Sequence, residues 1–102
     1  MKKSVSPSSL LGSVAAPPSK SFMQRAIAVA LLANGKSKII NPSYCNDAIA
    51  AMNIAEALGA TINKQADFVE ITGGLHLKSN QLNCGESGLS MRMFAPIAAL
   101  LE

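Results

Sequence analysis

Charged residues are scarce in this sequence of 102 residues. They make up 15% of the chain, while apolar residues make up 49%, against about 25% charged in an average soluble domain. A small domain needs polar residues to cover its surface, and large exposed apolar patches usually mark contacts with other protein. The shortage of charge therefore predicts that some apolar faces of this chain contact protein, and that the chain self-associates when it is alone.

Aromatic residues are also few, with three Phe, one Tyr and no Trp. Single-stranded nucleic acid is bound by stacking aromatic side chains together with a basic groove. The formal net charge is +3, but the lysines are spread along the chain and form no basic run. The composition thus argues against nucleic acid as a partner and favours small anions.

Cysteine pairs and long apolar runs are missing as well. Cys45 and Cys84 lie far apart with only His76 as a possible companion, which is too few ligands for a zinc site. The longest apolar stretch, 26–33, is much shorter than the roughly 20 residues of a membrane span, and the basic start is followed by a polar segment instead of a signal-peptide core. We expect a cytoplasmic protein with reduced thiols, no metal and no membrane contact.

Prolines, glycines and apolar spacing divide the chain into alternating strands and helices. Tandem prolines forbid helix at the end of an extended entry, residues 1–18. A crossover followed by a hairpin predicts an α/β (α+β) unit with one mixed sheet and helices on one face. The expected elements are a strand at 3–6, a helix at 21–33, a strand at 38–40, a helix capped by Asn46 or Asp47 and ending at Gly59, a hairpin of 60–64 and 68–72, weaker extended segments at 75–78 and 81–83, and a helix at 89–101 that Pro96 should kink or whose start it should move.

The first expected helix carries a possible anion site. Ser21 and Gln24 have the spacing of a capping box, and Ser21 and Arg25 are one helical turn apart with Lys20 just ahead. Unpaired N–H groups and the helix dipole attract anions to such a terminus, so these side chains could hold a phosphate and a carboxylate. A cap serine beside ordinary solvated cations is the commoner explanation of the spacing alone.

A second possible site is the turn Gly85-Glu86-Ser87-Gly88, with Arg92 one turn into the last helix. Glycines let a ligand approach the backbone closely, although such a turn is more often a simple connection between a strand and a helix. Asp47 is most simply a helix cap, and Cys84 a small core residue.

Taken together, four segments resemble the start of the 5-enolpyruvylshikimate-3-phosphate synthase family: 18–26 with its Lys-Ser-x-x-x-Arg element, Asn46-Asp47, Leu58-Gly59-Ala60, and 85–92. The resemblance covers about residues 14–101. It implies transfer of the enolpyruvyl group of phosphoenolpyruvate to the 5-hydroxyl of shikimate 3-phosphate, without a metal or organic cofactor. That reaction belongs to the shikimate pathway, which leads to chorismate and the aromatic amino acids.

The resemblance also implies roles for individual residues. Lys20 would contact both substrates, and Ser21 and Arg25 would bind shikimate 3-phosphate. Gly88 would offer its backbone to phosphoenolpyruvate, and Arg92 would line the cleft. Two positions depart from the family pattern, because Glu86 and Leu89 stand where many members have Asn and Thr, and a carboxylate there would repel phosphoenolpyruvate unless it turns away or pairs with a cation.

Members of this family are about four times as long and have two domains built from similar sheet-and-helix units, an inside-out α/β barrel. The resemblance therefore implies an N-terminal fragment: residues 1–18 would be a crossing segment that belongs to the other domain, and residues 19–102 an incomplete first unit. It would contain no catalytic acid or base and be inactive alone.

Other interpretations stay open. The related enolpyruvyl transferase that acts on UDP-N-acetylglucosamine shares the fold and the donor, but it tends to have Asn after the lysine, so Ser21 and Arg25 favour shikimate. A small basic module that binds nucleic acid and a purely structural interaction protein are the candidates from other classes.

Overall fold

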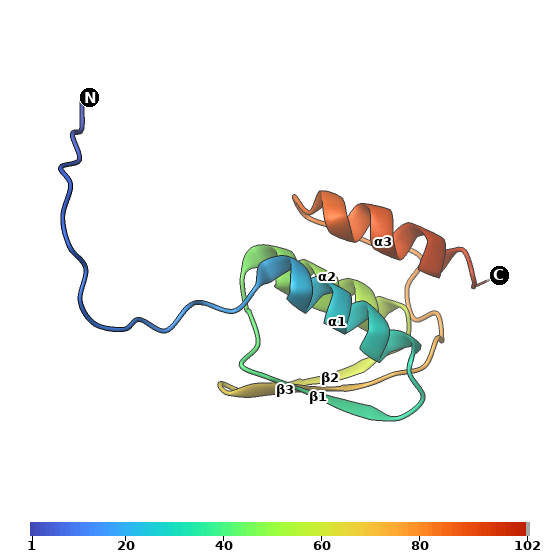
Figure 1. Ribbon diagram of the computed structural model, residues 1–102. Helices are drawn as coiled ribbons and strands as arrows, with labels where there is room; N and C mark the ends of the chain where they lie inside the picture. Colours follow the sequence, from blue (N-terminus) through green and yellow to red (C-terminus); the bar gives the residue numbers. More distant parts are fainter. Residues whose placement is uncertain (102) are drawn as a thin grey trace.

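The computed structural model describes residues 1–101, which form three helices and three strands (Figure 1). A long arm, residues 1–19, has no regular secondary structure and extends away from the body. The elements that follow are α1 (Lys20–Leu32), β1 (Lys36–Ile40), α2 (Asn46–Ala57), β2 (Thr61–Lys64), β3 (Phe68–Thr72) and α3 (Gly88–Ala98).

The sheet has the order β1-β3-β2 and is antiparallel throughout. Thr72 of β3 pairs with both Lys36 of β1 and Thr61 of β2. β1 and β2 therefore run in the same direction, as expected for strands joined by the α2 crossover, but β3 folds back between them. The expected mixed sheet is wrong because the hairpin strand occupies the place beside β1, which gives a split βαβ arrangement.

The strand expected at 3–6 is also absent, and Val5 is 96% exposed. No neighbouring strand offers hydrogen bonds to this segment, and an isolated strand is not stable in water. The extended segments expected at 75–78 and 81–83 do not join the sheet either. The N–H groups of His76 and Lys78 donate instead to the carbonyls of Leu58 and Ala57 at the end of α2.

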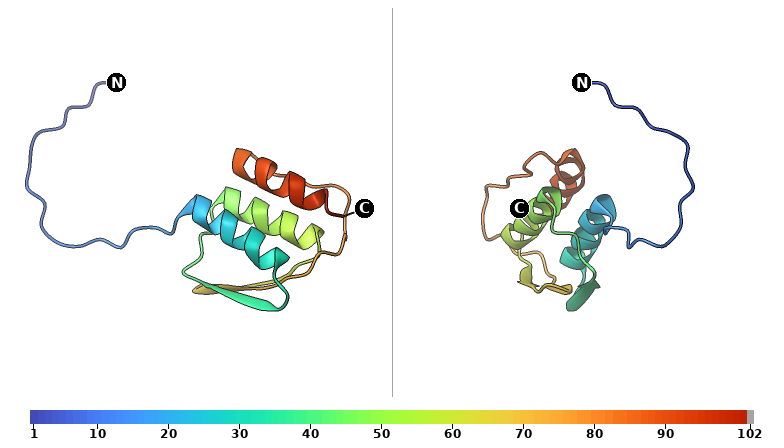
Figure 2. Two further views of the ribbon diagram at one scale, coloured as in Figure 1. Left: turned by 45° about the vertical axis from the view of Figure 1, so that its right-hand side comes forward. Right: turned by 90° about the vertical axis from the view of Figure 1, so that its left-hand side faces the viewer.

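The helices form two layers above the sheet (Figures 1 and 2). α1 and α2 cover one face of the strands, and α3 packs on α1 and α2 without contacting the strands in the described part of the chain. The core between these layers is apolar, with Ile27, Leu31, Met52, Val69 and Phe94 almost completely buried. The predicted α/β character is confirmed, whereas the second helical layer was not expected.

The helix starts differ by one or two residues from those expected. Ser19, which follows the extended prolines, caps α1 by accepting a hydrogen bond from the Phe22 N–H at 3.2 Å, so Ser21 lies in the first turn instead of capping it. Cys45 is the residue before α2, and Asn46 and Asp47 lie in its first turn. α3 continues through Pro96 and ends at Ala98.

Candidate functional site

The N-termini of α1, α2 and α3 lie at one end of the molecule, where the arm joins the body (Figures 1 and 2). The colours of Figures 1 and 2, which follow the chain from blue to red, show that α1, α2 and α3 run in the same direction. Parallel packing places the positive ends of the helix dipoles together and directs their unpaired N–H groups the same way. This end of the molecule therefore attracts anions even before any side chain is considered.

Lys20 and Asp47 join the first turns of α1 and α2. The Lys20 ammonium lies 3.2 Å from an Asp47 carboxylate oxygen, and the two side chains are 61% and 21% exposed. The sequence interpretation of Asp47 as a helix cap missed this pair, because partners on different helices leave no signal in local spacing. Lys20 is held at the shared helix end and remains open to a ligand.

Ser21 and Arg25 are both exposed on α1, as their spacing predicts. The Arg25 guanidinium carbon lies 5.9 Å from the centre of the Phe22 ring. A cation over an aromatic face is restrained without losing its hydrogen-bonding groups. Arg25 therefore keeps its donors free for an anion.

Gly88 and Arg92 form the α3 part of the site. A Cβ placed on Gly88 would lie 3.8 Å from an Arg92 Nη atom, so the guanidinium covers the first turn of α3. Ser87 caps this helix by accepting from the Ser90 N–H at 3.0 Å. Glu86 is exposed and makes no ion pair within residues 1–101.

A buried hydrogen-bond network joins the α1 and α3 parts. The Gln24 Oε1 atom accepts from the hydroxyls of Ser87 at 2.6 Å and Ser90 at 2.8 Å. These residues are next to Arg25 and Gly88, so the two predicted anion-binding groups are neighbours in space. The sequence predicted a capping box for Gln24 and missed this network. The sequence feature that could have indicated it is a polar residue on the apolar face of the helix that also carries Met23 and Ile27.

Cys45 lies at the N-terminus of α2 and is partly exposed. Partial burial acts to raise the pKa of its thiol, but the Ser43 hydroxyl and the N–H groups of Ala48 and Asp47 outweigh that effect and lower the pKa below its ordinary value. The Ser43 hydroxyl has the largest lowering effect, the two N–H groups add to it, and the Asp47 carboxylate acts in the opposite direction. The same helix-end field that attracts anions thus favours the thiolate.

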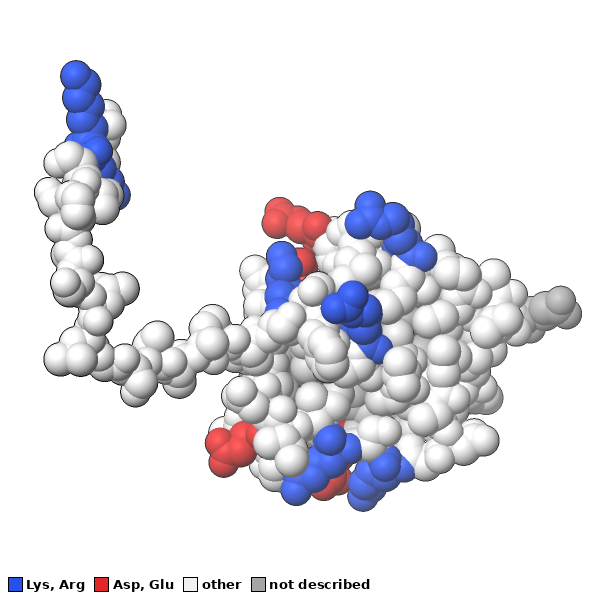
Figure 3. All heavy atoms as spheres, in the orientation of Figure 1, with Lys and Arg blue, Asp and Glu red and all other residues white. Residues whose placement is uncertain are grey.

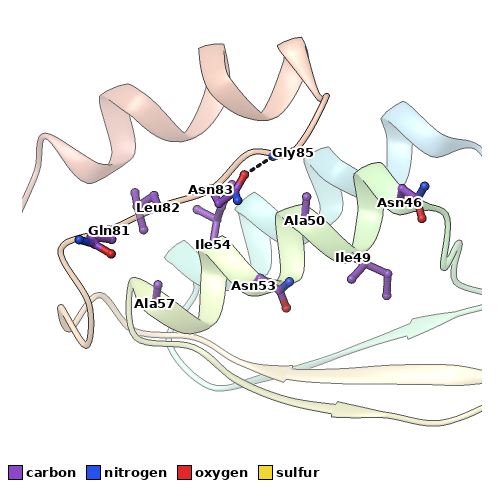
Figure 4. Close-up of a pocket in the computed structure, with 10 residues that line it drawn as sticks. All are labelled: Asn46, Ile49, Ala50, Asn53, Ile54, Ala57, Gln81, Leu82, Asn83 and Gly85. Atoms are coloured by element: carbon purple, nitrogen blue, oxygen red, sulfur yellow. Dashed lines mark hydrogen bonds between the residues drawn. The ribbon is translucent and has the colours of Figure 1, made fainter.

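A groove of about 340 Å³ lies elsewhere, between α2 and the segment 81–85 (Figure 4). Ala50, Ile54 and Ala57 form part of its wall, and the Asn83 side chain turns toward Gly85 and accepts its N–H at 2.8 Å. None of its lining residues is charged. Gly85 of the predicted turn lines it, but Lys20, Ser21, Arg25, Gly88 and Arg92 do not, and its chemistry does not suit a phosphorylated ligand.

Residues 1–101 contain no group of three His, Cys, Asp or Glu side chains placed to hold a metal ion, and Cys45 and Cys84 are free thiols. None of the helices in this range has the length and apolar character to cross a bilayer. Basic side chains lie over the helical layers on the face shown in Figure 3, with others over the sheet.

These features define a class: an α/β unit with parallel helix N-termini and neighbouring basic side chains, groups of the kind that bind small anions in proteins. Comparison with known proteins makes the assignment specific. Residues 5–102 match the family of EPSP synthase (3-phosphoshikimate 1-carboxyvinyltransferase), and the chain belongs to that family.

Similar curated proteins carry the name 3-phosphoshikimate 1-carboxyvinyltransferase. The relative from Chlamydia felis is 44% identical over 96% of this chain, that from Clostridioides difficile 41% over 94%, and that from Methanocorpusculum labreanum 42% over the whole chain. The chain covers 23%, 25% and 25% of these relatives, respectively. It therefore spans about a quarter of their length.

Proposed function

We propose that this chain is the part of a 3-phosphoshikimate 1-carboxyvinyltransferase that binds one side of both substrates. In the proposed reaction, the 5-hydroxyl of shikimate 3-phosphate loses its proton and its oxygen bonds to C2 of phosphoenolpyruvate while C3 takes up a proton, which gives a tetrahedral intermediate. The C–O bond to phosphate then breaks, C3 gives up a proton, and the C2–C3 double bond forms again as phosphate leaves. The observation that supports this most directly is the family match together with Lys20 at the shared end of parallel helices.

The proposed roles follow the distribution of donors. Lys20, Ser21 and Arg25 lie within the first two turns of α1 and would hold shikimate 3-phosphate. Lys20 would also contact phosphoenolpyruvate, whose other partners would be the Gly88 backbone and the Arg92 guanidinium on α3. Both substrates are anionic, which suits sites made of cations and helix N-termini.

The whole protein would have two domains, with residues 1–18 crossing to the other domain and residues 19–102 forming part of the first unit. The remaining anion-binding groups and the catalytic acid and base would come from parts beyond this chain. Such an enzyme would work in the cytoplasm on freely diffusing substrates. The exposed arm, which contacts little of the body (Figure 1), is consistent with this arrangement.

We expect the chain alone to be inactive and to bind weakly. Charge-assisted contacts contribute about 1.5–3 kcal/mol each, whereas association costs an estimated 4–15 kcal/mol. Shikimate 3-phosphate should then bind no better than roughly millimolar. A calorimetric dissociation constant in the low micromolar range would show that the site is more complete.

A chimera tests the function directly. Residues 1–102 would replace the matching segment of the Chlamydia felis relative, and phosphate release would be measured with phosphoenolpyruvate and either shikimate 3-phosphate or UDP-N-acetylglucosamine. We expect activity with the shikimate acceptor only, since Ser21 and Arg25 favour it. Activity with the nucleotide sugar alone would favour the related transferase.

Lys20→Ala and Lys36→Ala in the chimera form a matched pair. The Lys36 ammonium pairs with Glu70 at 3.3 Å and is 64% exposed, close to the values for Lys20, but it lies on the sheet. Lys20→Ala should reduce kcat/KM by about a hundredfold or more, because a charged contact to both substrates is lost. Lys36→Ala should leave it unchanged, and equal losses would contradict the proposed site.

A further inference from the structure

We propose that Gln24 is a positioning residue that sets the α3 half of the anion site against the α1 half. This inference rests on the proposed function for its ligands, but its structural part can be tested without them. The α1 half consists of Lys20, Ser21 and Arg25, and the α3 half consists of Gly88 and Arg92.

The Gln24 side chain is 1% exposed, and Ser87 and Ser90 are 4% and 0% exposed. Buried polar groups are costly unless they are hydrogen-bonded, and every one in this cluster has a partner. No buried side-chain nitrogen or oxygen within residues 1–101 lacks one. The cluster is thus a complete network between helices more than 60 residues apart in sequence.

The hydrogen-bond donors fix how the amide is oriented. The Lys20 carbonyl can only accept, so the Gln24 Nε2 atom, 3.4 Å away, faces it. The Oε1 atom then faces the two serine hydroxyls, and the Ser87 oxygen in turn accepts the Ser90 N–H. The α3 cap therefore contacts the first turn of α1 through a single side chain.

The place of α3 in the fold explains why such a link is needed. α3 rests on α1 and α2 and has no strand neighbour in the described part of the chain. Its fully buried apolar anchor is Phe94, and apolar contacts tolerate sliding and rotation better than directional hydrogen bonds do. The network lies at the N-terminal end of α3, where Gly88 and Arg92 must be held.

The two substrates depend differently on this link. The proposed contacts of shikimate 3-phosphate in this chain all lie on α1, whereas those of phosphoenolpyruvate lie on both α1 and α3. Displacing α3 should therefore weaken phosphoenolpyruvate binding and spare shikimate 3-phosphate. A merely structural role for Gln24 would not distinguish the ligands.

The test compares Gln24→Met with Gln81→Met in the full 102-residue chain. Met has nearly the shape of Gln but accepts no normal hydrogen bond, and Gln81 is an exposed glutamine whose side chain has no hydrogen bond in the structure. Residual dipolar couplings would give the orientation of α3 relative to α1. Titrations of amide chemical shifts with each substrate would give the two dissociation constants.

We expect Gln24→Met to reorient α3 and to raise the phosphoenolpyruvate dissociation constant about tenfold, the scale of a small misplacement, with less than a twofold change for shikimate 3-phosphate. Gln81→Met should change neither. An unchanged α3 orientation, or equal weakening of both ligands, would overturn the proposal. Because the chain alone is expected to bind no better than roughly millimolar, a lack of binding to the unmodified chain does not count against the proposed function, which the chimera tests separately. The couplings alone then decide the role of Gln24.

Ser90→Ala provides a second variant if Gln24→Met does not fold. It removes one of the two hydroxyls and leaves Gln24 and the Ser87 cap in place. We expect a smaller reorientation in the same direction and a two- to fivefold selective loss for phosphoenolpyruvate. An α3 orientation identical to that of the unmodified chain would overturn the proposal on this variant too.

Discussion

Lys20 and Lys36 form two similar ion pairs. The pair distances are 3.2 and 3.3 Å, and both lysines are more than half exposed. Exposed pairs contribute about 0–1 kcal/mol to stability because water and salt screen them. We propose a ligand for Lys20, at the shared helix end, and none for Lys36.

We predict that Lys20→Ala and Lys36→Ala each lower the free energy of unfolding by less than about 1 kcal/mol. Urea denaturation of the chain followed by circular dichroism would measure both. The difference between the two lysines should appear only in ligand binding. A loss of several kcal/mol in Lys20→Ala would mean that this pair holds α1 and α2 together.

Cys45 gives a prediction about pH. Because its pKa is lowered in the folded state, alkylation by iodoacetamide should reach half its maximal rate at a lower pH in the folded chain than in urea. A Cys84→Ser background isolates the signal. The lowered pKa stabilises the folded chain above the ordinary thiol pKa, and this stabilisation disappears as the pH falls through the pKa of the folded state. Identical pH profiles of alkylation for the folded and unfolded chain would contradict the assignment.

Single residues were predictable from the sequence where their role is local. Ser21 and Arg25 lie on α1 and Arg92 lies on α3, as spacing indicates, whereas Gly88 was expected in the preceding turn and is the first residue of α3. The partners of Lys20 and Gln24 were not predictable, because they come from other helices. Ser19 and Ser21 were both possible caps of α1. Ser19 caps the helix in the structure, directly after the extended prolines.

At the scale of elements, the close approach of α1 and β3 depends on Gly73. A Cβ there would lie 2.2 Å from the carbonyl oxygens of Ala30 and Ala33, which no side-chain movement can relieve. The neighbouring backbone is fixed by hydrogen bonds from Gly73 to Gly35 and from Gly74 to Leu31. The residue therefore sets the distance between helix and sheet.

We predict that Gly73→Ala lowers the free energy of unfolding by more than about 3 kcal/mol, since backbone must move. Gly35→Ala is the control, because Gly35 has a φ of +113° but nothing within 4 Å of an added Cβ. Conformational strain alone costs about 1–3 kcal/mol. The midpoints of urea denaturation would be compared for the two variants. A loss of stability in Gly73→Ala that is equal to or smaller than the loss in Gly35→Ala would contradict the steric argument.

The types and order of the main elements could be read from the sequence, but their pairing could not. Periodicity identified α1, α2, α3 and the hairpin because these signals lie within short windows. The order of the strands depends on which strand of the hairpin pairs with β1, and that pairing is made between segments far apart in the sequence. For the same reason α3 was expected near the sheet, whereas it forms a second layer (Figure 2).

At the scale of the whole molecule, much apolar surface is exposed. The radius of gyration is 17.1 Å, compared with about 13 Å for a compact chain of 100 residues, because the arm extends outward. Large apolar side chains are exposed on the helices, on β1, along the arm and in the turn after α3; they include Val5, Leu10, Leu11, Val14, Phe22, Val29, Leu32, Ile40, Met91 and Leu100. The scarcity of charge in the sequence is thus visible on the surface.

We predict that the isolated chain forms dimers through the exposed faces of α1 and α3, with exchange of the arm as a second contact. Sedimentation equilibrium at tens of micromolar would detect them. Val29→Glu should favour the monomer, because Val29 is 68% exposed and lies on the proposed face. A clean monomer mass for the unmodified chain, without binding of a hydrophobic dye, would refute the prediction.

The parallel direction of α1, α2 and α3 has an energetic consequence. Like poles of neighbouring helices repel one another when they lie side by side, so their N-termini contribute an unfavourable electrostatic energy at the end that carries Lys20. A dianion bound there reduces that repulsion, and a ligand that binds only the folded state stabilises it. A substrate of this site would therefore act as a counterion for the fold. Its binding would stabilise the helix ends at the place where the proposed α1 and α3 halves of the site meet.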